Sequence, residues 1–447
     1  MADNLIKIWT DIEDARRTVL QRRDMMSLDE VPERVLAGIR TVFGAELTPG
    51  EAVARILKDV RTRGDAALRD WTRRIDGLEI EDLAVPTSAL QDAYEELPAE
   101  LRDAMELSAA RIRAFHEHQP VESWTTHDMG GTLGQRVIPL ERVGVYVPGG
   151  TAPLPSSLLM AAIPARVAGV DDITVCTPPG RPDGDVPGII LAAAYIARVD
   201  RVVSLGGAQA IAALAFGTES LPRVDKIVGA GGLFTTLAKQ QVFGIVGLDG
   251  VYGPTETVVV ADDSANPAWV AADLLAQAEH DVLATAILLT PSLELGRAVQ
   301  AEVERQVTQL SRAEILRVSL DGQAGIVITP DLETAARLAD EFAPEHLCLS
   351  VREPEVWSER IRNAGGLFLG EHSFEVLGDY VAGPSHIMPT GGTARFSSPV
   401  NVLDFVKIMS IVALDPVTTA AISGTAACFA ASESLTAHAA AAKARGE

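Results

Sequence analysis

Cysteine is scarce in this sequence. Only Cys176, Cys348 and Cys428 occur among the 447 residues, and they lie far apart along the chain. This number and spacing exclude a disulfide framework and a zinc site built on cysteine thiolates. Each cysteine has apolar neighbours in the sequence. We therefore predict three small buried thiols and no cysteine nucleophile.

A long uninterrupted apolar run is also missing. A membrane-spanning helix needs roughly 18 consecutive apolar residues. Candidates such as PGIILAAAYIARVD are interrupted by Arg198 and Asp200. The first residues, MADNLIKIWTDIEDARR, carry acids where a secretory signal would have a basic start and then an apolar core. We therefore expect a cytoplasmic protein that does not enter a membrane.

Basic residues are outnumbered by acidic ones. The chain has 38 lysines and arginines against 61 aspartates and glutamates, which gives a formal charge of −23. Such a charge repels phosphate backbones and anionic membrane surfaces, so nucleic acid is not an expected partner. With 47% hydrophobic residues, a chain of this length can bury large cores and should form two or more domains.

The periodicity of the sequence changes near residue 125. Before it, apolar positions recur at i, i+3 and i+4, which predicts helices. After it, short apolar runs alternate with helical stretches, as in VGVYVPGG followed by PSSLLMAAIPARVAG, and the alternation resumes after residue 255. This pattern predicts βαβ units and parallel sheets. Two sheets are expected, since one sheet of this many strands would be unusually wide.

The end of the chain, from about Val400, is rich in alanine and has a helical pattern. A helix with so few bulky side chains seldom stands alone. We therefore expect the tail to dock on another surface, such as a second subunit.

Three turns place glycines where the backbone could approach a phosphate at a helix N-terminus: VPGGTAPLP, LGGAQA and GAGG. None of them matches G-x-G-x-x-G, and glycines are common after strands, so each turn alone indicates a nucleotide only weakly. Three such turns in one α/β unit strengthen the prediction, because ligands of these sheets bind outside the carboxyl ends of the strands.

Two later segments carry groups suited to acid–base chemistry. In FAPEHLCLSV, Pro344 should end a helix at Ala343, which leaves Glu345 and His346 in the turn before the next strand. An adjacent Glu and His suit proton transfer, although such a pair in a surface turn is more often only solvated. The segment EVLGDYVAGPSHIMPTGG is longer than a simple connection needs, and it contains Asp379 and His386.

The stretch LLAQAEHD is ambiguous. Gln277 and His280 are three residues apart and share a helix face, whereas Glu279 points elsewhere. The stretch is not H-E-x-x-H, so it does not indicate a metalloprotease. On spacing alone, a solvated polar face is the preferred interpretation, and half of a metal site is the alternative.

A set of segments in fixed order resembles the histidinol dehydrogenase family over essentially the entire chain: VGVYVPGG, GGAQAIAALAFGTE, DKIVGAGG, YGPTET, DLLAQAEHD, FAPEHL, GDYVAGPSHIMPT and ESLTAH. The resemblance implies an α/β protein with two incomplete Rossmann-like parallel-sheet domains. It implies an N-terminal helical arm (1–40), a first α/β domain with the zinc and catalytic residues (41–145 plus 255–400), a second on the NAD side (146–254), and a swapped C-terminal helical tail (401–447).

The resemblance also implies a zinc- and NAD-dependent homodimer with shared active sites, which oxidises L-histidinol to L-histidine through the aldehyde. Its one zinc ion per subunit would be held by Gln277, His280, Asp379 and the partner's His438. His346 would be the base for the alcohol proton, and Glu345 would activate water. Substrate contacts are implied for Thr255, Gln277, His280, His346, Asp379, His386, Glu433 and His438, and a carboxylate such as Glu433 suits a substrate ammonium group.

For NAD, the matching positions are Tyr146, Gln209 and Gly232. Here the sequence departs from the family, because the usual Gly-Pro-Gly-Asn appears as GAGG, and Gly232 therefore lacks an asparagine side chain. Thr255 replaces a usual serine but keeps its hydroxyl. These departures keep open a related dehydrogenase of another small alcohol, such as sulfopropanediol. A zinc hydrolase or a non-catalytic nucleotide-binding module is a weaker alternative.

Overall fold

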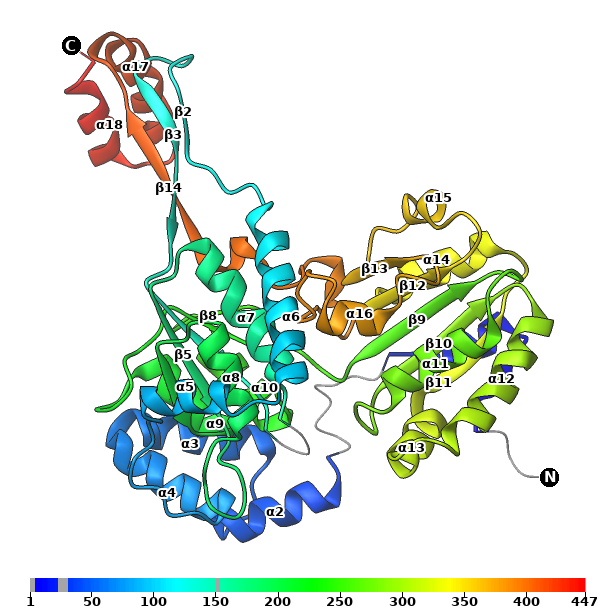
Figure 1. Ribbon diagram of the computed structural model, residues 1–447. Helices are drawn as coiled ribbons and strands as arrows, with labels where there is room; N and C mark the ends of the chain where they lie inside the picture. Colours follow the sequence, from blue (N-terminus) through cyan, green and yellow to red (C-terminus); the bar gives the residue numbers. More distant parts are fainter. Residues whose placement is uncertain (1–4, 23–30, 150–152, 447) are drawn as a thin grey trace.

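Two parallel sheets form the body of the computed structural model, which describes residues 5–22, 31–149 and 153–446 (Figure 1). One sheet has the strand order β1-β11-β10-β9-β12-β13 and the other β6-β5-β4-β7-β8. The first contains β1 (Lys7–Trp9), β9 (Glu256–Ala261), β10 (Thr285–Thr290), β11 (Ala324–Ile328), β12 (His346–Ser350) and β13 (Gly366–Leu369). The second contains β4 (Arg142–Tyr146), β5 (Asp172–Thr177), β6 (Arg201–Ser204), β7 (Lys226–Val228) and β8 (Gly247–Leu248).

The two sheets share one winding pattern. In each, three successive strands are added outward in one direction, and the chain then returns to add two strands on the other side of the first, as β4-β5-β6 and then β7-β8. All pairings within these two sheets are parallel. This is the doubly wound arrangement of Rossmann-like domains, so the predicted fold class is confirmed.

Helices cover both sheets. Around the five-stranded sheet lie α7 (Pro155–Ala168), α8 (Gly188–Ile196), α9 (Gly207–Phe216) and α10 (Leu233–Val242). Around the six-stranded sheet lie α11 (Pro267–Ala278), α12 (Leu293–Val307), α13 (Ala313–Gln323), α14 (Leu332–Phe342) and α15 (Pro354–Ser358). The short α16 (Glu375–Tyr380) follows β13.

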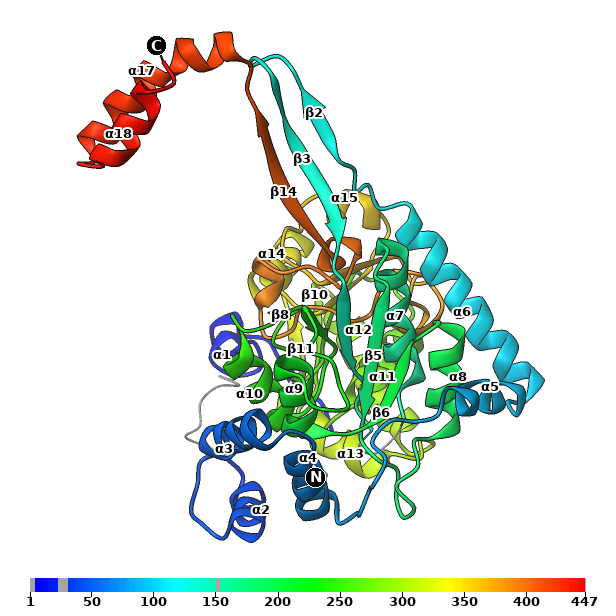
Figure 2. The ribbon, with the colours of Figure 1, turned by 90° about the vertical axis from the view of Figure 1, so that its left-hand side faces the viewer.

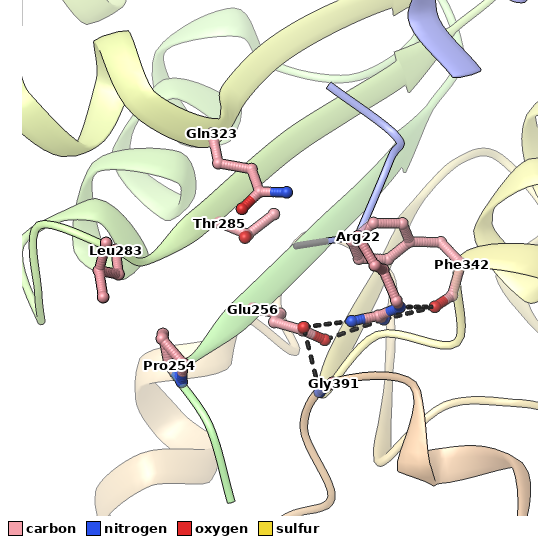
Figure 3. A pocket seen from close by; sticks show the side chains of 8 residues that line it. All are labelled: Arg22, Pro254, Glu256, Leu283, Thr285, Gln323, Phe342 and Gly391. Carbon is pink, nitrogen blue, oxygen red and sulfur yellow. Dashed lines mark hydrogen bonds and ion pairs between the residues drawn. The ribbon is translucent and has the colours of Figure 1, made fainter. Parts of the chain in front are cut away.

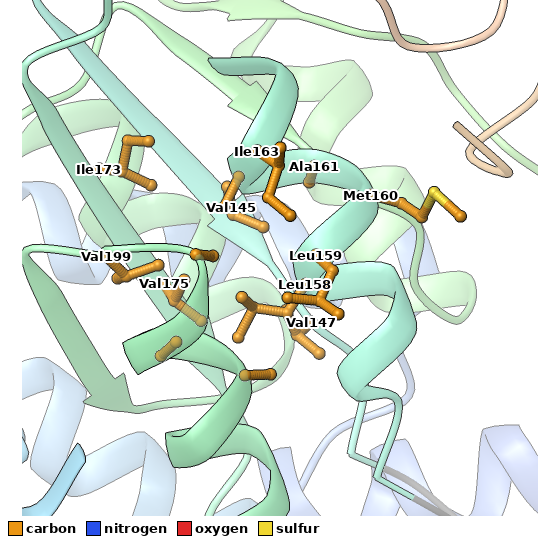
Figure 4. Close-up of a cluster of buried hydrophobic side chains, with 14 of the residues drawn as sticks. Val145, Val147, Leu158, Leu159, Met160, Ala161, Ile163, Ile173, Val175 and Val199 are labelled. Carbon is orange, nitrogen blue, oxygen red and sulfur yellow. The ribbon is translucent and has the colours of Figure 1, made fainter. Parts of the chain in front are cut away.

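The core of the five-stranded domain explains why α7 lacks a polar face. Its residues from Leu158 to Ala165 are all buried, because α7 is packed between the sheet and α6 (Ala99–Glu117). Figure 4 shows Ile163 beside Val145 of β4, and Leu158 and Leu159 beside Val147, which follows that strand. Burial of such side chains contributes roughly 1.5–3 kcal/mol each.

The N-terminal helices pack differently from the sequence-based assignment. Residues 41–145 were expected to belong with the domain of Gln277, but Val53 and Ile56 of α3 (Pro49–Arg63) share a core with Ile211 of α9. The remaining helices before this domain are α2 (Glu33–Phe43), α4 (Asp65–Asp76) and α5 (Thr87–Glu95). An amphipathic pattern reveals the apolar face of a helix but not the sheet against which that face packs. For this reason the sequence assigned residues 41–145 to the wrong domain.

The segment 1–40 is likewise more than a helical arm. Its β1 is an edge strand beside β11, with Ile8 opposite Ile326. After it, α1 (Ile12–Arg17) begins at Asp11, whose carboxylate accepts from the backbone N–H groups of Glu13 and Asp14. Residues 5–22 are therefore part of the six-stranded domain, whereas α2 packs on α3 of the other domain.

The C-terminal segment projects away from the body, as Figures 1 and 2 both show. It begins with a strand, β14 (Val406–Ala413), where a helical pattern was predicted. This strand pairs antiparallel with β3 (Thr132–Pro139), which also pairs with β2 (Trp124–Thr126). After β14, the helices α17 (Pro416–Ser432) and α18 (Thr436–Lys443) pack on one another.

The projecting helices leave apolar side chains uncovered. Val417 is 81% exposed and Phe429 is 69% exposed. Cys428 of α17 is exposed as well, which corrects the prediction of three buried thiols; Cys176 and Cys348 are buried as predicted. Among the described residues, no helix is both long and apolar enough to cross a membrane.

Candidate active site

A polar cluster lies at the amino edge of the six-stranded sheet. β9 and β12 begin there with Glu256 and His346, and they are neighbours in the sheet. A helix that follows a strand in a βαβ unit runs back to this edge, so α11 ends here and brings Gln277 beside the two strand starts. Ligands of open α/β sheets usually bind at the opposite, carboxyl edge, so these side chains need a separate explanation.

Three side chains of this cluster form a hydrogen-bonded chain. Gln277 Nε2 donates to Thr255 Oγ1 at 2.6 Å, and Thr255 Oγ1 donates to Glu345 Oε2 at 2.5 Å. The same oxygen of Glu345 accepts from the backbone N–H of Glu256 at 3.0 Å. Gln277 is fully buried, so the preferred sequence interpretation of a solvated polar face is wrong for this residue.

The carboxyl of Glu345 titrates far above its ordinary range. Burial raises its pKa to about 7, against the lowering effects of nearby His346 and of the hydrogen bond from Thr255. A carboxyl with such a pKa can accept a proton near neutrality, as a general base must.

His346 has one ring nitrogen engaged and one unpartnered. Nδ1 lies 3.3 Å from the carbonyl oxygen of Glu256, which can only accept a hydrogen bond. Nδ1 therefore carries the hydrogen in the neutral ring, and Nε2 is left with a lone pair. Nε2 is buried without a hydrogen-bond partner, 3.9 Å from Asp379 Oδ1. This arrangement suits proton acceptance at Nε2.

The loop after α16 joins the two domains beside the cluster. His386 Nδ1 donates to the carbonyl oxygen of Asp379 at 2.7 Å. Its Nε2 lies 3.2 Å from Ser157 Oγ of α7, in the other domain. Burial lowers the pKa of His386, and Asp379 partly offsets this. A neutral His386 thus links the domains at the cluster.

Three of the residues predicted for the metal and the substrate are exposed. His280 follows the end of α11, and it lies close enough to His386 to lower the pKa of that ring further. Glu433 ends α17 and His438 lies in α18. Figure 1 shows these two helices far from α16, so one chain does not bring Glu433 and His438 to the other predicted residues.

The residues present fit a metal ion with nitrogen and oxygen ligands. Gln277 Oε1 is buried and has no hydrogen-bond partner, because the amide nitrogen is the atom held by Thr255. Asp379 supplies a carboxylate close to His346. No group of three or more His, Cys, Asp or Glu side chains that could hold a metal occurs within the described part of the chain. A complete site therefore needs the Gln277 oxygen and a further ligand.

The carboxyl edge of the five-stranded sheet carries the residues predicted for NAD. Tyr146 ends β4, and its hydroxyl accepts from the backbone N–H of Gly207 at 3.1 Å. Gln209 of α9 is buried, and both polar atoms of its side chain lack partners. Such orphaned groups are unfavourable unless a ligand satisfies them. The VPGGTAPLP turn lies partly outside the described residues, at 150–152.

Gly232 precedes α10, where no side chain caps the helix. A Cβ atom added at Gly232 would meet nothing within 4 Å, so the backbone does not require glycine at this position. No side chain caps the N-terminus of α9 or of α10 at this edge, and helix N-termini favour an anionic ligand.

Sequence patterns missed two buried features near these sites. Glu375 is buried 3.8 Å from His346 Nδ1 and accepts from Thr257 Oγ1, and burial raises its pKa well above the ordinary value. Lys239 donates to Asp249 Oδ1 at 2.6 Å and to the carbonyl of Gly229 at 2.7 Å, which fixes the GAGG turn. Lys239 stands out in the sequence as the single charged residue of α10, whereas Glu375 shares the short α16 with Asp379 and has no signal of its own.

The fold and the site define a two-domain α/β protein with Rossmann-like sheets and a buried acid–base cluster. The model of the family "Histidinol dehydrogenase" matches residues 46–446. A histidinol dehydrogenase of Deinococcus radiodurans is 52% identical over 417 residues, which cover 93% of this chain and 95% of that protein. The one of Nitrosospira multiformis is 49% identical over 392 residues, or 87% and 89% of the two chains.

A solved structure agrees with these sequence comparisons. Histidinol dehydrogenase from Elizabethkingia anophelis superposes with a TM-score of 0.89 at 32% identity, and the match covers 100% of this chain and 99% of that one. The chain belongs to the histidinol dehydrogenase family and is an oxidoreductase.

The pKa of Glu345 predicts a pH-dependent stability difference. The ordinary pKa is 4.5 and the folded one about 7, so the folded protein keeps a proton that the unfolded chain releases between these values. Wild-type stability should therefore fall as pH rises through this window, whereas Glu345→Gln, which does not titrate, should lack the loss. Between about pH 5 and about pH 8, the free energy of unfolding of the variant should therefore rise by on the order of 3 kcal/mol relative to that of wild type.

Urea denaturation of metal-free protein at the two pH values measures this difference. Glu314→Gln, on the α13 helix and away from the cluster, is the control and should follow wild type. A stability difference between Glu345→Gln and wild type that stays constant with pH would contradict the raised pKa.

Proposed function

We propose that this protein oxidises L-histidinol to L-histidine through the aldehyde, in histidine biosynthesis, with two NAD per substrate. The observation that carries the proposal is the pairing of two proton acceptors at one buried place, the Glu345 carboxylate and the free Nε2 of His346. A four-electron oxidation of an alcohol needs both: one for the alcohol proton and one for the water added to the aldehyde. The names and high identity of the relatives support histidinol as the substrate.

His346 would act in the first oxidation. Its Nδ1–H is held by the carbonyl of Glu256, so Nε2 is the atom that takes the hydroxyl proton as the carbon loses hydride. The carboxylate of Glu345 lies 3.7 Å from Nδ1 and would stabilise the imidazolium that results.

Glu345 would act in the second oxidation. Its carboxylate takes a proton from water as the water oxygen bonds to the aldehyde carbon, and the hydrate can then lose its hydride. Thr255 and the backbone N–H of Glu256 orient the carboxylate for this step. No cysteine nucleophile is used, in agreement with the buried thiols of Cys176 and Cys348, whose pKa values are raised by burial.

Two bound groups complete the proposed site. One zinc ion per subunit, held by Gln277, His280, Asp379 and the partner's His438, would orient the amino alcohol and polarise its oxygen. NAD bound beside Tyr146, Gln209 and Gly232 would accept the hydride. The unpartnered Gln277 Oε1 and the unpartnered amide of Gln209 support these two placements.

The uncovered tail supports a homodimer with shared active sites. Strand β14 exposes Val412, and helix α17 exposes Val417 and Phe429. Large uncovered apolar surfaces mark interfaces. A second copy that covers β14 and α17 would also bring Glu433 and His438 to the first copy's site. There, Glu433 and His386 would contact the substrate. We expect the enzyme to work in the cytoplasm.

An alternative in the same fold is a dehydrogenase of another small alcohol, such as sulfopropanediol. Gly232 is the observation that favours it, because the family's usual asparagine is missing there. Glu433, which suits the ammonium group of histidinol, favours the primary proposal.

The stoichiometry of the reaction separates these functions. Purified protein with zinc, NAD and L-histidinol should form about two NADH per histidinol consumed, since each NAD takes up one hydride. A chelator should abolish the reaction. About one NADH would indicate a simple alcohol dehydrogenase, and no NADH with this substrate would overturn the proposal.

In the same assay, His346→Asn should lower kcat by about 10²- to 10⁴-fold with a smaller change in KM, because a base is lost but substrate contacts remain. His372→Asn is the matched control, since His372 is exposed and contacts the ring of Trp269. Equal activity of His346→Asn and His372→Asn would exclude His346 as the base.

Gly232→Asn should tighten NAD binding. The position is open to a side chain, and an amide there can donate and accept hydrogen bonds that glycine cannot make. We expect the Kd for NAD, measured by isothermal titration calorimetry, to fall by about fivefold or more, with Gly38→Asn on the exposed surface of α2 as the control. An unchanged Kd would show that Gly232 is not at the cofactor.

A further inference from the structure

Arg22 follows β1 and α1 in the N-terminal arm and contacts Glu256 of the polar cluster. Its guanidinium forms a two-pronged ion pair with Glu256, in which Nη2 lies 3.0 Å from Oε2 and Nη1 contacts Oε1. Both side chains are mostly buried, with 25% and 10% of their surface exposed. Figure 3 shows this pair at one side of a small hollow between β9 and the end of α14.

The same guanidinium holds the end of α14. Arg22 Nε donates to the carbonyl of Phe342 at 2.9 Å, and Nη2 donates to that of Ala343 at 3.0 Å. The guanidinium carbon also lies 4.0 Å from the centre of the Phe342 ring. Ala343 has a φ of 51°, in the left-handed region that disfavours a residue with a Cβ. A cation on these carbonyls stabilises the helix end and its turn.

This turn leads directly into Glu345 and His346, and Glu256 contacts both of them through its main chain. Its N–H donates to Glu345 Oε2 at 3.0 Å, and its carbonyl oxygen lies 3.3 Å from His346 Nδ1. Its side chain is held by Arg22 and by the N–H of Gly391, 3.1 Å from Oε1. Arg22 thus fixes both the residue that orients the two bases and the turn that carries them.

Arg22 has no nitrogen left over for a ligand. Nε, Nη1 and Nη2 are all engaged, by two main-chain carbonyls and one carboxylate. A Cβ atom added at Gly392 would lie only 3.1 Å from Arg22 Nε, so the loop that contains Gly392 packs directly against the guanidinium. A direct contact with substrate is therefore not the role of this side chain.

We propose that Arg22 is a positioning residue for the proton transfers of Glu345 and His346, acting through Glu256 and the end of α14. The inference rests on the proposed function of the two bases. A lysine could not replace it, because one ammonium group cannot reach two carbonyls and both oxygens of a carboxylate in the same plane.

The test compares Arg22→Ala with Arg17→Ala in the full-length, zinc-loaded enzyme. Arg17 ends α1, is exposed, and lies on the same arm. For Arg22→Ala we expect kcat with L-histidinol and NAD to fall at least about tenfold while both KM values stay within about threefold, because small displacements of catalytic groups reduce turnover more than binding. Guanidinium at a low, non-denaturing concentration should restore part of this kcat, and it should not change that of Arg17→Ala.

A second readout does not depend on turnover. Hydrogen exchange of the backbone N–H groups in residues 342–349, followed by mass spectrometry, should be faster in Arg22→Ala and unchanged in Arg17→Ala. If Arg22→Ala does not fold, Arg22→Lys decides the question and should show the same loss of kcat without a loss of substrate binding.

The outcomes separate the two proposals. No NADH from the wild-type enzyme would overturn the proposed function itself. An active wild-type enzyme whose kcat is preserved in Arg22→Ala or Arg22→Lys would overturn only the role of Arg22. A fall in kcat that guanidinium does not relieve, with unchanged exchange in residues 342–349, would overturn it as well.

Discussion

The structure of the site depends on satisfying polar groups that are buried at the amino edge of a sheet. Burying an amide, a carboxyl and an imidazole costs several kcal/mol unless each finds partners. The chain from Gln277 through Thr255 to Glu345 meets most of that need. Two atoms are left over, Gln277 Oε1 and His346 Nε2. We propose that these two atoms contact the bound zinc and the substrate hydroxyl. The polar atoms without a protein partner therefore mark the place where the reaction would occur.

The surrounding fold keeps this network in register. β9 and β12 are adjacent parallel strands, so Thr257 and His346 lie opposite one another and the two strand starts cannot move independently. α11 brings Gln277 to the same edge, and the His386–Ser157 contact ties the cluster to the second domain. At the other sheet, Lys239 and Asp249 together hold Gly229 at the carboxyl end of β7.

Much of the fold could be predicted from the sequence, and the misses have physical reasons. The alternation of strands and helices predicts two parallel sheets because buried strands have continuous apolar runs, such as VVVA in β9. β1 was missed because three residues are too few to show a pattern, and β14 because most of its side chains are exposed. The helices from residue 49 to 117 were expected, but their partner sheet was not.

The site was less accessible to pattern analysis than the fold. Glu345 and His346 could be singled out from their position before a strand, and the resemblance supplied the rest. Spacing gave the wrong environment for Gln277, because a buried amide and a solvated one have the same sequence. Arg22 could not be found at all, since its partner Glu256 is 234 residues away. Contacts of that kind depend on tertiary packing, which leaves no local signature.

The central claim is that one subunit supplies Glu345 and His346 while its partner supplies Glu433 and His438. Mixing two inactive variants, Glu345→Gln and His438→Ala, after dissociation and reassociation tests it directly. In a mixed dimer, one of the two sites receives both intact contributions. Random pairing should therefore restore about a quarter of wild-type activity. A mixture as inactive as its two components would contradict the account.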